Sequence, residues 1–196
     1  MKIYDNHIAE PIRLELIKSS EYHSFPRATY KFWDFKDFNS PSGIIQRALH
    51  HIWHDNVDPK QFPNGGIEYW INLDKVIDGK HKQAPAMWHP DVYEPDTKTR
   101  DNWESGIIGC VYYPYVKCVG GFFEICDNNT KLSHKEYVSY VCTLDESTQV
   151  ERIKAKSNRA IFYDPYRIHR ASRIHEGFRE CLASTVWENK PLTFNG

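Results

Sequence analysis

The stretch GIIGCVYYPYVKCVGGFFEIC, residues 106–126, decides the fold class. It contains two short runs rich in β-branched and aromatic residues, 106–115 and 121–126, with a Gly-Gly pair before the second. Runs of this length and composition, bounded by glycine or proline, are typical of β-strands. Further runs of the same kind lie at 67–73, 86–93, 137–144, 150–156, 160–163, 169–174 and 178–186. Such a series predicts an antiparallel β-sandwich or barrel.

One clear helix is predicted ahead of this series, over residues 43–54, with Ser42 as its N-cap. Its apolar residues fall on one helical face: Ile45, Leu49, Ile52 and Trp53. The first forty residues are irregular and aromatic-rich, so we expect short strands and turns there. A chain of 196 residues is predicted to form a single domain, with a helical N-terminal layer at about 1–64 and a β-rich core at about 65–190.

Composition excludes several function classes. The 25 Lys and Arg balance the 26 Asp and Glu, which argues against a nucleic-acid partner, because phosphate neutralisation favours a basic surface. The segment 1–17 mixes charged residues among apolar ones, and no stretch is long and apolar enough to cross a membrane. The five cysteines contain no Cys-x-x-Cys pair, so we expect reduced, mostly buried thiols. We therefore expect a soluble cytoplasmic protein.

A candidate metal site begins at His89 and Asp91. Side chains two residues apart project from the same face of a strand, so these two could bind one ion together. His169, which follows the apolar run 160–163 and a turn, is the candidate third ligand. Two histidines and one carboxylate form the facial triad of Fe(II) oxygenases, which leaves three coordination positions for substrate and dioxygen.

A candidate anion-binding residue, Arg179, lies ten residues beyond His169. Gly177 suits a hairpin that would direct the guanidinium of Arg179 into the same cavity. A planar, permanently charged fork suits a buried carboxylate. A ligand that chelates iron at one end and carries a second carboxylate at the other would span His169 and Arg179. This description fits 2-oxoglutarate.

These motifs, together with the Gly-Gly-Phe-Phe-Glu run at 120–124, resemble those of the Fe(II)- and 2-oxoglutarate-dependent dioxygenases, most closely the prolyl-hydroxylase-like branch. The resemblance covers about residues 65–187. It implies a mainly β fold, the double-stranded β-helix or jelly roll, with N-terminal helices buttressing one sheet. It also implies that His89, Asp91 and His169 bind the iron.

Further roles follow from the same resemblance. Arg179 would hold the distal carboxylate of 2-oxoglutarate, and Tyr113 would assist that arginine through its hydroxyl. The cofactors would be Fe(II), 2-oxoglutarate and dioxygen, with ascorbate as a further candidate. The implied reaction is hydroxylation of an unactivated C–H bond of a small molecule or a peptidyl residue, with release of succinate and CO2. Desaturation or cyclisation could begin in the same way.

Two positions bear on how closely the chain follows that family. Many relatives have serine two residues after the arginine as an extra carboxylate contact, and this chain has Cys181 there. Relatives that halogenate have a small residue at the position of Asp91, so retention of the carboxylate favours hydroxylation. The substrate-binding loops match no known pattern, and the sequence leaves the substrate and the oligomeric state open.

Two other functions stay open. One is a jelly-roll binding protein of cupin type without oxygenase activity, in which Arg179 would have no purpose. The other is a zinc hydrolase, because His50 and His54 share a helical face at i and i+4. No glutamate follows His50 in the His-Glu-x-x-His arrangement, so a solvated helix face is the favoured interpretation of these two histidines.

Basic and aromatic residues near the candidate site have candidate roles in substrate binding. Basic residues flank the candidate ligand His169: Arg167, Arg170 and Arg173. They could bind an acidic substrate group, although a solvated strand face is the favoured interpretation of the wider basic region. Trp88 and Trp103 could line the cavity or fill the core.

Overall fold

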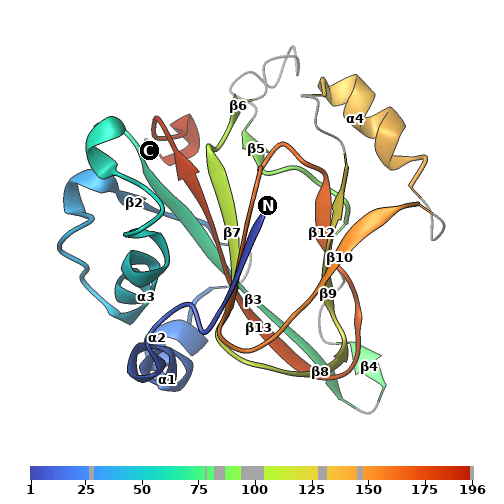
Figure 1. The fold of residues 1–196 in the computed structure, drawn as a ribbon, viewed down its shortest axis with the longest axis horizontal. Helices are drawn as coiled ribbons and strands as arrows, with labels where there is room; N and C mark the ends of the chain where they lie inside the picture. The colour runs from blue at the N-terminus through green and yellow to red at the C-terminus, as the bar shows by residue number, and fades with distance from the viewer. Residues whose placement is uncertain are drawn as a thin grey trace.

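The computed structural model describes residues 1–26, 29–77, 79–81, 87–93, 104–127, 132–144 and 148–194. Its strands form two antiparallel sheets that face each other, with helices on the outer side of the larger one (Figure 1). The larger sheet has the order β1 (Lys2–Asp5), β11 (Arg159–Tyr163), β7 (Ile108–Tyr113), β13 (Ile174–Trp187), β3 (Gly66–Ile77) and β2 (Lys31–Asp34). Within it, β4 (Lys80–His81) pairs with β3 and β8 (Val116–Gly120) pairs with β13.

The smaller sheet supplies the opposite wall. It has the order β10 (Val150–Lys154), β9 (Phe122–Cys126) and β12 (His169–Ala171). A separate two-stranded ribbon pairs β5 (Val92–Tyr93) with β6 (Glu104–Ser105). This mainly β arrangement confirms the predicted jelly roll.

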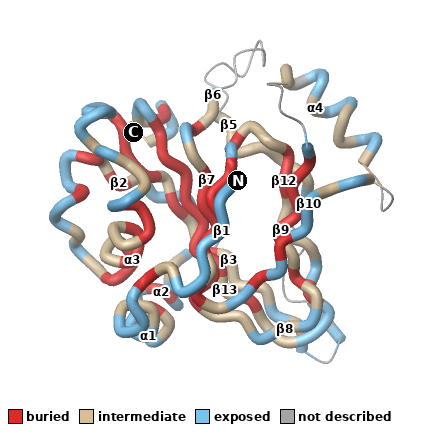
Figure 2. Tube along the Cα trace, in the orientation of Figure 1, coloured by how far each residue is buried: buried red, intermediate tan, exposed pale blue. Residues whose placement is uncertain are grey.

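Strand β13 shows why the central strands are apolar on both faces. Leu182 and Val186 pack with the helices, whereas the alternate residues Cys181 and Ala183 face the smaller sheet. Figure 2 shows buried residues along the central strands of the larger sheet, with exposed residues concentrated in the outer loops and helices. Because both faces of such a strand are covered, its sequence is a continuous apolar run.

The buttressing helices are α1 (Glu10–Lys18), α2 (Ser20–His23) and α3 (Ile44–Trp53). Helix α3 buries Ile45, Leu49 and Ile52 almost completely, and burial of each such side chain contributes about 1.5–3 kcal/mol. The indole Nε1 of Trp53 donates a hydrogen bond to Ser184 Oγ at 3.0 Å, which joins the end of α3 to β13. The amphipathic pattern predicted this helix correctly, although Gly43 rather than Ser42 is its N-cap.

Two local predictions are wrong. The composition of 137–144 predicts a strand, but α4 (His134–Val141) covers most of it. Ser133 Oγ accepts a hydrogen bond from Glu136 N, and the Glu136 carboxylate accepts one from Ser133 N at 2.8 Å. This capping box starts a helix despite the aromatic and β-branched composition that follows. The first forty residues likewise contain α1 and α2 in addition to short strands.

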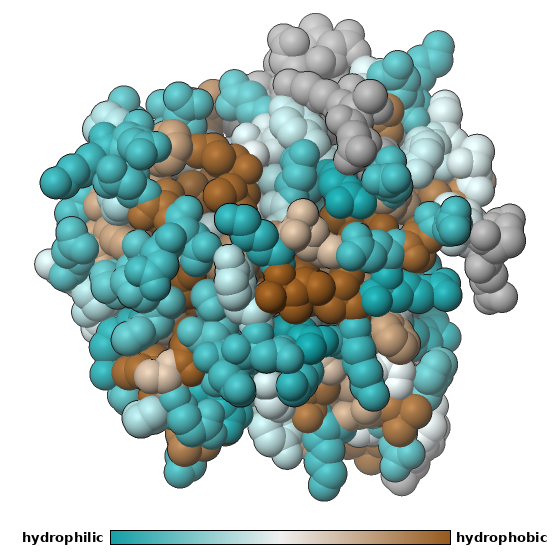
Figure 3. Space-filling model, viewed as in Figure 1, coloured by the Kyte–Doolittle hydropathy of each residue, from teal (hydrophilic) through white to brown (hydrophobic). Residues whose placement is uncertain are grey.

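The segment predicted as a strand at 86–93 is described only from residue 87. Within it, 92–93 form β5 and His89 forms an isolated β-bridge with His169. Among the helices of the described residues, none has both the length and the apolarity needed to cross a bilayer. Figure 3 shows hydrophilic side chains surrounding separate hydrophobic patches on one face of the molecule.

Candidate metal centre

His89, Asp91 and His169 meet where the loop before β5 joins the smaller sheet. His89 and His169 exchange two backbone hydrogen bonds, from His89 N to His169 O at 3.0 Å and from His169 N to His89 O at 2.9 Å. Asp91 N donates to Pro165 O at 2.9 Å. The candidate ligand atoms of the three residues all lie within 4.8 Å of one another. Backbone pairing therefore fixes the spacing of all three side chains.

The two imidazoles present the same nitrogen to Asp91. His89 Nδ1 lies 2.7 Å from Met87 O, and His169 Nδ1 lies 2.8 Å from Arg167 O. Because a carbonyl can only accept, each Nδ1 carries a proton, which leaves each Nε2 as the nitrogen that can bind a metal. The Nε2 atoms of His89 and His169 lie 3.8 and 3.6 Å from Asp91 Oδ1.

Asp91 is held by hydrogen bonds to its other oxygen. Its Oδ2 accepts from the Tyr163 hydroxyl at 2.6 Å and from Thr185 Oγ1 at 3.5 Å, which leaves Oδ1 directed at the imidazoles. Burial raises the pKa of Asp91, but the two histidines and the Tyr163 hydrogen bond lower it to about 2. Burial, with a smaller effect of His169, lowers the pKa of His89. A carboxylate and two imidazole nitrogens on one side suit Fe(II) and similar divalent ions.

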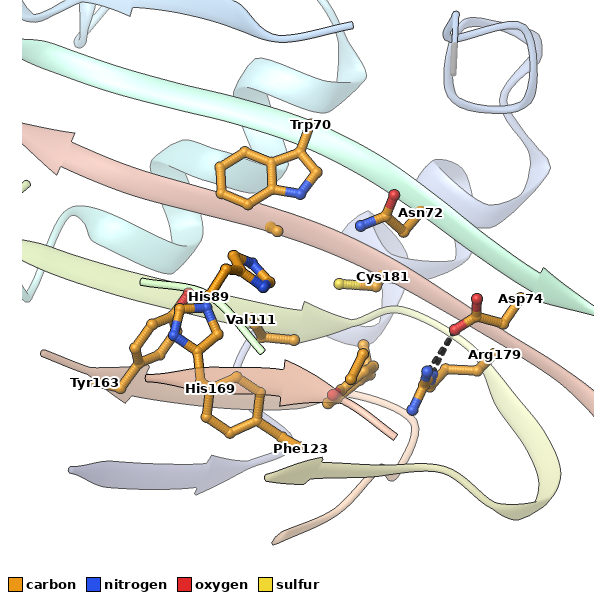
Figure 4. Close-up of a pocket in the computed structure, with 13 residues that line it drawn as sticks. Trp70, Asn72, Asp74, His89, Val111, Phe123, Tyr163, His169, Arg179 and Cys181 are labelled. Carbon is orange, nitrogen blue, oxygen red and sulfur yellow. Dashed lines mark hydrogen bonds and ion pairs between the residues drawn. The ribbon is translucent and has the colours of Figure 1, made fainter. Parts of the chain in front are cut away.

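A cavity of about 140 Å³ extends from this triad between the two sheets. Figure 4 shows His89 and His169 at one end of it and Arg179 with Asp74 at the other. Side chains from β3 and β13 form one wall: Trp70, Asn72, Asp74, Arg179, Cys181 and Ala183. Val111, Tyr113, Phe123 and Tyr163 line the rest, which makes the middle of the cavity apolar and its two ends polar.

Arg179 is 2% exposed and only partly satisfied. Its Nε and Nη2 donate to Asp74 Oδ2 at 2.9 and 2.5 Å, and Nη2 also donates to Ser172 O at 3.0 Å. Within the described residues, Arg179 Nη1 and the Tyr113 hydroxyl are buried and lack any hydrogen-bond partner. Buried donors of this kind are rare, and both line the cavity.

Gly121 keeps space open beside the unpaired nitrogen. Its φ is +75°, and a Cβ there would lie 2.7 Å from Ile174 Cγ2 and 3.2 Å from Arg179 Nη1. A side chain at this position would be strained and would crowd the guanidinium. The second glycine of the Gly-Gly pair is therefore needed at the Arg179 end of the cavity. The two unpaired donors and the open space fit a carboxylate, such as the distal group of 2-oxoglutarate.

The hairpin predicted at Gly177 is wrong. Gly177 lies inside β13 with a φ of +82°, near a register shift, and its Cα faces Lys117 O so closely that a Cβ would lie 2.0 Å from it. The chain turns instead at Ser172 and Arg173, between β12 and β13. Arg179 consequently faces the cavity from the larger sheet and His169 from the smaller one.

Cys181, the departure noted in the sequence, lines the cavity two residues from Arg179. Burial raises the pKa of its thiol to about 12, so the group is neutral. The zinc site considered for the helix histidines differs from the triad. The rings of His50 and His54 stack at 5.7 Å, but the group of metal-binding side chains found among the described residues is His89, Asp91 and His169.

Two of the basic residues near His169, Arg167 and Arg170, have protein partners. Arg170 Nε donates to Glu124 at 2.7 Å and its guanidinium lies 4.2 Å from the centre of the Trp88 ring, while Arg167 donates to Cys126 O. Because Arg170 follows His169 and Trp88 precedes His89, this contact joins the two candidate ligand segments. Trp88 therefore packs under a guanidinium rather than lining the cavity, and Trp103 lies outside the described residues.

Sequence reasoning missed the β3 contribution. Glu68, Trp70, Asn72 and Asp74 alternate with the apolar residues of β3, which marks a strand with one face on the core and one on a polar site. The signal was present in the sequence as a period of two. The arginine partner of Asp74 comes from β13, 105 residues away, and local sequence carries no sign of that pairing.

No protein-family model matches the chain, and no curated protein matches it in sequence. Solved structures do match. A prolyl-4-hydroxylase of Pseudomonas putida aligns with a TM-score of 0.57 at 10% identity, over 96% of this chain and 92% of that one.

Two further structures align similarly. AviO1 of Streptomyces viridochromogenes has a TM-score of 0.52 at 12% identity, over 92% of this chain and 86% of that one. The viral collagen prolyl hydroxylase of Paramecium bursaria Chlorella virus-1 has a TM-score of 0.51 at 12% identity, over 94% of this chain and 87% of that one. At these identities the likeness establishes a shared prolyl-4-hydroxylase-like fold.

Proposed function

We propose that the protein is an Fe(II)- and 2-oxoglutarate-dependent dioxygenase that hydroxylates an unactivated C–H bond of a small molecule or a peptidyl residue. The observation that carries this proposal is that a His-Asp-His triad and an unpaired, buried arginine nitrogen open into the same cavity. The prolyl-hydroxylase fold of the similar structures supports it.

In this proposal His89, Asp91 and His169 hold the iron through the two Nε2 atoms and Oδ1. When bound, Fe(II) with 2-oxoglutarate and dioxygen supplies the C–H oxidation, coupled to decarboxylation of 2-oxoglutarate to succinate and CO2. The Nη1 group of Arg179 and the Tyr113 hydroxyl bind the distal carboxylate. Charge-assisted hydrogen bonds of this kind are strong in a cavity with little water.

The surrounding residues orient these groups. Tyr163 keeps Asp91 turned so that Oδ1 faces the imidazoles. The carbonyls of Met87 and Arg167 hold the two Nδ1 protons, so the histidines keep the tautomer that a metal requires. Val111 and Phe123 cover the apolar middle of the cavity and exclude water from it.

Anaerobic addition of Fe(II) and 2-oxoglutarate tests the proposal. We expect a weak visible charge-transfer band in the wild-type protein and its loss in His169→Ala. The matched control is His54→Ala, which removes an exposed histidine of the competing zinc pair and should leave the band intact. A band that is absent from wild type, or that survives in His169→Ala, would overturn the assignment.

A non-catalytic cupin-type ligand-binding protein is the second candidate. One observation favours it: Arg179 already has an ion-pair partner in Asp74, so it has a purpose without a cosubstrate. The two candidate functions differ in how 2-oxoglutarate should affect the thermal stability of the protein. A ligand that binds only the folded protein raises its melting temperature. 2-Oxoglutarate should therefore stabilise the iron-loaded protein against heat in the oxygenase and have no effect in the cupin-type alternative.

A further inference from the structure

A second cavity, of about 340 Å³, adjoins the metal triad at the end opposite Arg179. Its lining includes the aromatic side chains Tyr30, Trp70 and Trp187, the acidic side chains Glu68 and Asp91, and the amide of Asn72. Trp70, Asn72 and His89 line both cavities, so the two spaces adjoin at these side chains. A molecule in the second cavity would reach the candidate iron from the side away from Arg179.

Glu68 is the carboxyl group of this cavity that lies outside the metal triad, and it lacks a counter-charge in the described part of the chain. Its side-chain hydrogen bond comes from Trp187 Nε1 at 2.9 Å, and none of the ion pairs found there includes it. Across the sheet it faces Thr185, whose hydroxyl bonds to Asp91. Burial raises the pKa of Glu68 to about 7, which is the signature of a carboxylate short of positive partners.

Aromatic rings complete the cavity. The rings of Tyr30 and Trp70 lie 5.3 Å apart at 54°, and Tyr30 is 53% exposed. An exposed tyrosine and a half-buried tryptophan therefore line the cavity, where a bound group can contact their rings. Ring faces attract cations through their quadrupole, and a carboxylate among them adds direct charge attraction. An anion would be repelled by Glu68 and Asp91, and a purely apolar group would leave Glu68 without a counter-charge.

We propose that this second cavity is the substrate subsite and that it binds a positively charged nitrogen group, an ammonium or a guanidinium. The cation would lie between Glu68 and the rings of Tyr30 and Trp70. The inference rests on the proposed function for its statement that the bound molecule is the substrate. It adds the substrate class: a basic amine or guanidine compound, free or as a peptide side chain.

Calorimetric titration of the metal-free protein with matched probes tests the subsite without turnover. The probes are N-acetyl-arginine amide against N-acetyl-citrulline amide, and N-acetyl-lysine amide against N-acetyl-norleucine amide. We expect each charged probe to bind about tenfold more tightly than its neutral partner. Glu68→Gln should reduce that preference to about twofold, which leaves only the attraction of the rings.

Two further variants make the test specific. Asp74→Asn removes the other carboxylate of the same strand face and should keep the preference, because Asp74 lies at the Arg179 end. Tyr30→Ala, at an exposed position, should weaken the charged probes about threefold without affecting folding. Equal affinities in wild type, no measurable binding of either charged probe, or a preference that survives Glu68→Gln would overturn the inference.

The anaerobic charge-transfer band separates this failure from failure of the proposed function. A band in wild type and in Glu68→Gln, with no cation preference, overturns only the substrate class. A cation preference in a protein that never gives the band overturns the oxygenase and leaves the cation subsite standing. Retention of the band in Glu68→Gln also shows that the variant is folded.

Discussion

Two carboxylates on the same face of β3, Asp74 and Glu68, meet opposite conditions at the two ends of the site. Asp74 lies directly across from Arg179 on β13 and forms a nearly buried ion pair with it (Figure 4). Glu68 lies across from Thr185 and receives one indole hydrogen bond. The register of β13 against β3 decides which carboxylate is neutralised.

Because of this difference, the two ends of the site favour ligand groups of opposite charge. At the Arg179 end, one unpaired nitrogen and the Tyr113 hydroxyl can accept an anion. At the Glu68 end, a carboxylate among aromatic rings can accept a cation. A cosubstrate with two carboxylates and a basic substrate would each be repelled from the end that belongs to the other. Electrostatic complementarity of this kind contributes specificity by penalising the wrong orientation.

The largest effect is expected from removing the ion pair between Arg179 and Asp74. Arg179→Gln should lower the free energy of unfolding by about 3–5 kcal/mol, because the nearly buried Asp74 loses its counter-charge. The double variant Arg179→Gln with Asp74→Asn should recover most of this loss and still fail to bind 2-oxoglutarate. Urea unfolding and the charge-transfer band measure the two properties. Arg173→Gln, at an exposed arginine near the same corner, is the control and should match wild type.

If Arg179→Gln lost less than about 1 kcal/mol, the ion pair would behave like an exposed one. The contrast between the two ends would then rest on Glu68 alone.

The uncompensated carboxyl group of Glu68 should make the stability of the protein depend on pH. The pKa of Glu68 is raised from 4.5 to about 7 in the folded state, so the folded protein keeps a proton that the unfolded chain has released. Stability from this group is therefore lost as the pH rises from about 4.5 to about 7, by about 3 kcal/mol in total. Glu68→Gln should gain about that much relative to wild type across this window in urea unfolding of the metal-free protein. A constant difference between the two proteins would show that Glu68 is solvated.

The sequence predicts the residues of the metal triad better than it predicts their surroundings. Strand alternation predicts His89 and Asp91 on one face without knowledge of the fold, although the structure forms only an isolated bridge at His89 and a strand that starts at Val92. The same rule identifies the polar face of β3. The identity of the facing residue depends on strand register, which is set by packing over the whole sheet. Hence the sequence predicts that Arg179 faces the cavity. It does not predict that Arg179 pairs with Asp74 or that Glu68 lacks a counter-charge.

Local chemistry also explains the mistakes in the fold. The segment of α4 has a strand-like composition, and a capping box of Ser133 and Glu136 outweighs it. The corner between β12 and β13 falls at Ser172 and Arg173, while Gly177 is needed inside β13 by the close approach of Lys117 O. A glycine at positive φ is visible in sequence only as a glycine, and a turn and a close backbone contact look alike there.

Removing the carboxylate of Asp74, at the Arg179 end, should increase the difference in charge preference between the two ends. The expected effect is moderate. Asp74→Asn removes the negative charge that competes for Arg179 and repels an incoming carboxylate. The dissociation constant of 2-oxoglutarate, from titration of the charge-transfer band, should fall about fivefold, which corresponds to about 1 kcal/mol. A weaker affinity would instead mean that Asp74 positions the guanidinium, and that the pair acts as a support for the cosubstrate site.

The smallest effect concerns Tyr113, whose buried hydroxyl lacks a hydrogen-bond partner among the described residues. Tyr113→Phe removes an unsatisfied polar group, so stability in urea should stay within about 1 kcal/mol of wild type or rise slightly. Its affinity for 2-oxoglutarate should fall about threefold, because one hydrogen bond to the distal carboxylate is lost. Tyr112→Phe is the matched control: Tyr112 faces the helices and its hydroxyl bonds Asn158 at 3.0 Å, so that variant should lose stability and keep its affinity. If Tyr112→Phe lost affinity for 2-oxoglutarate and Tyr113→Phe kept it, the hydroxyl that binds the carboxylate would come from the other face of β7.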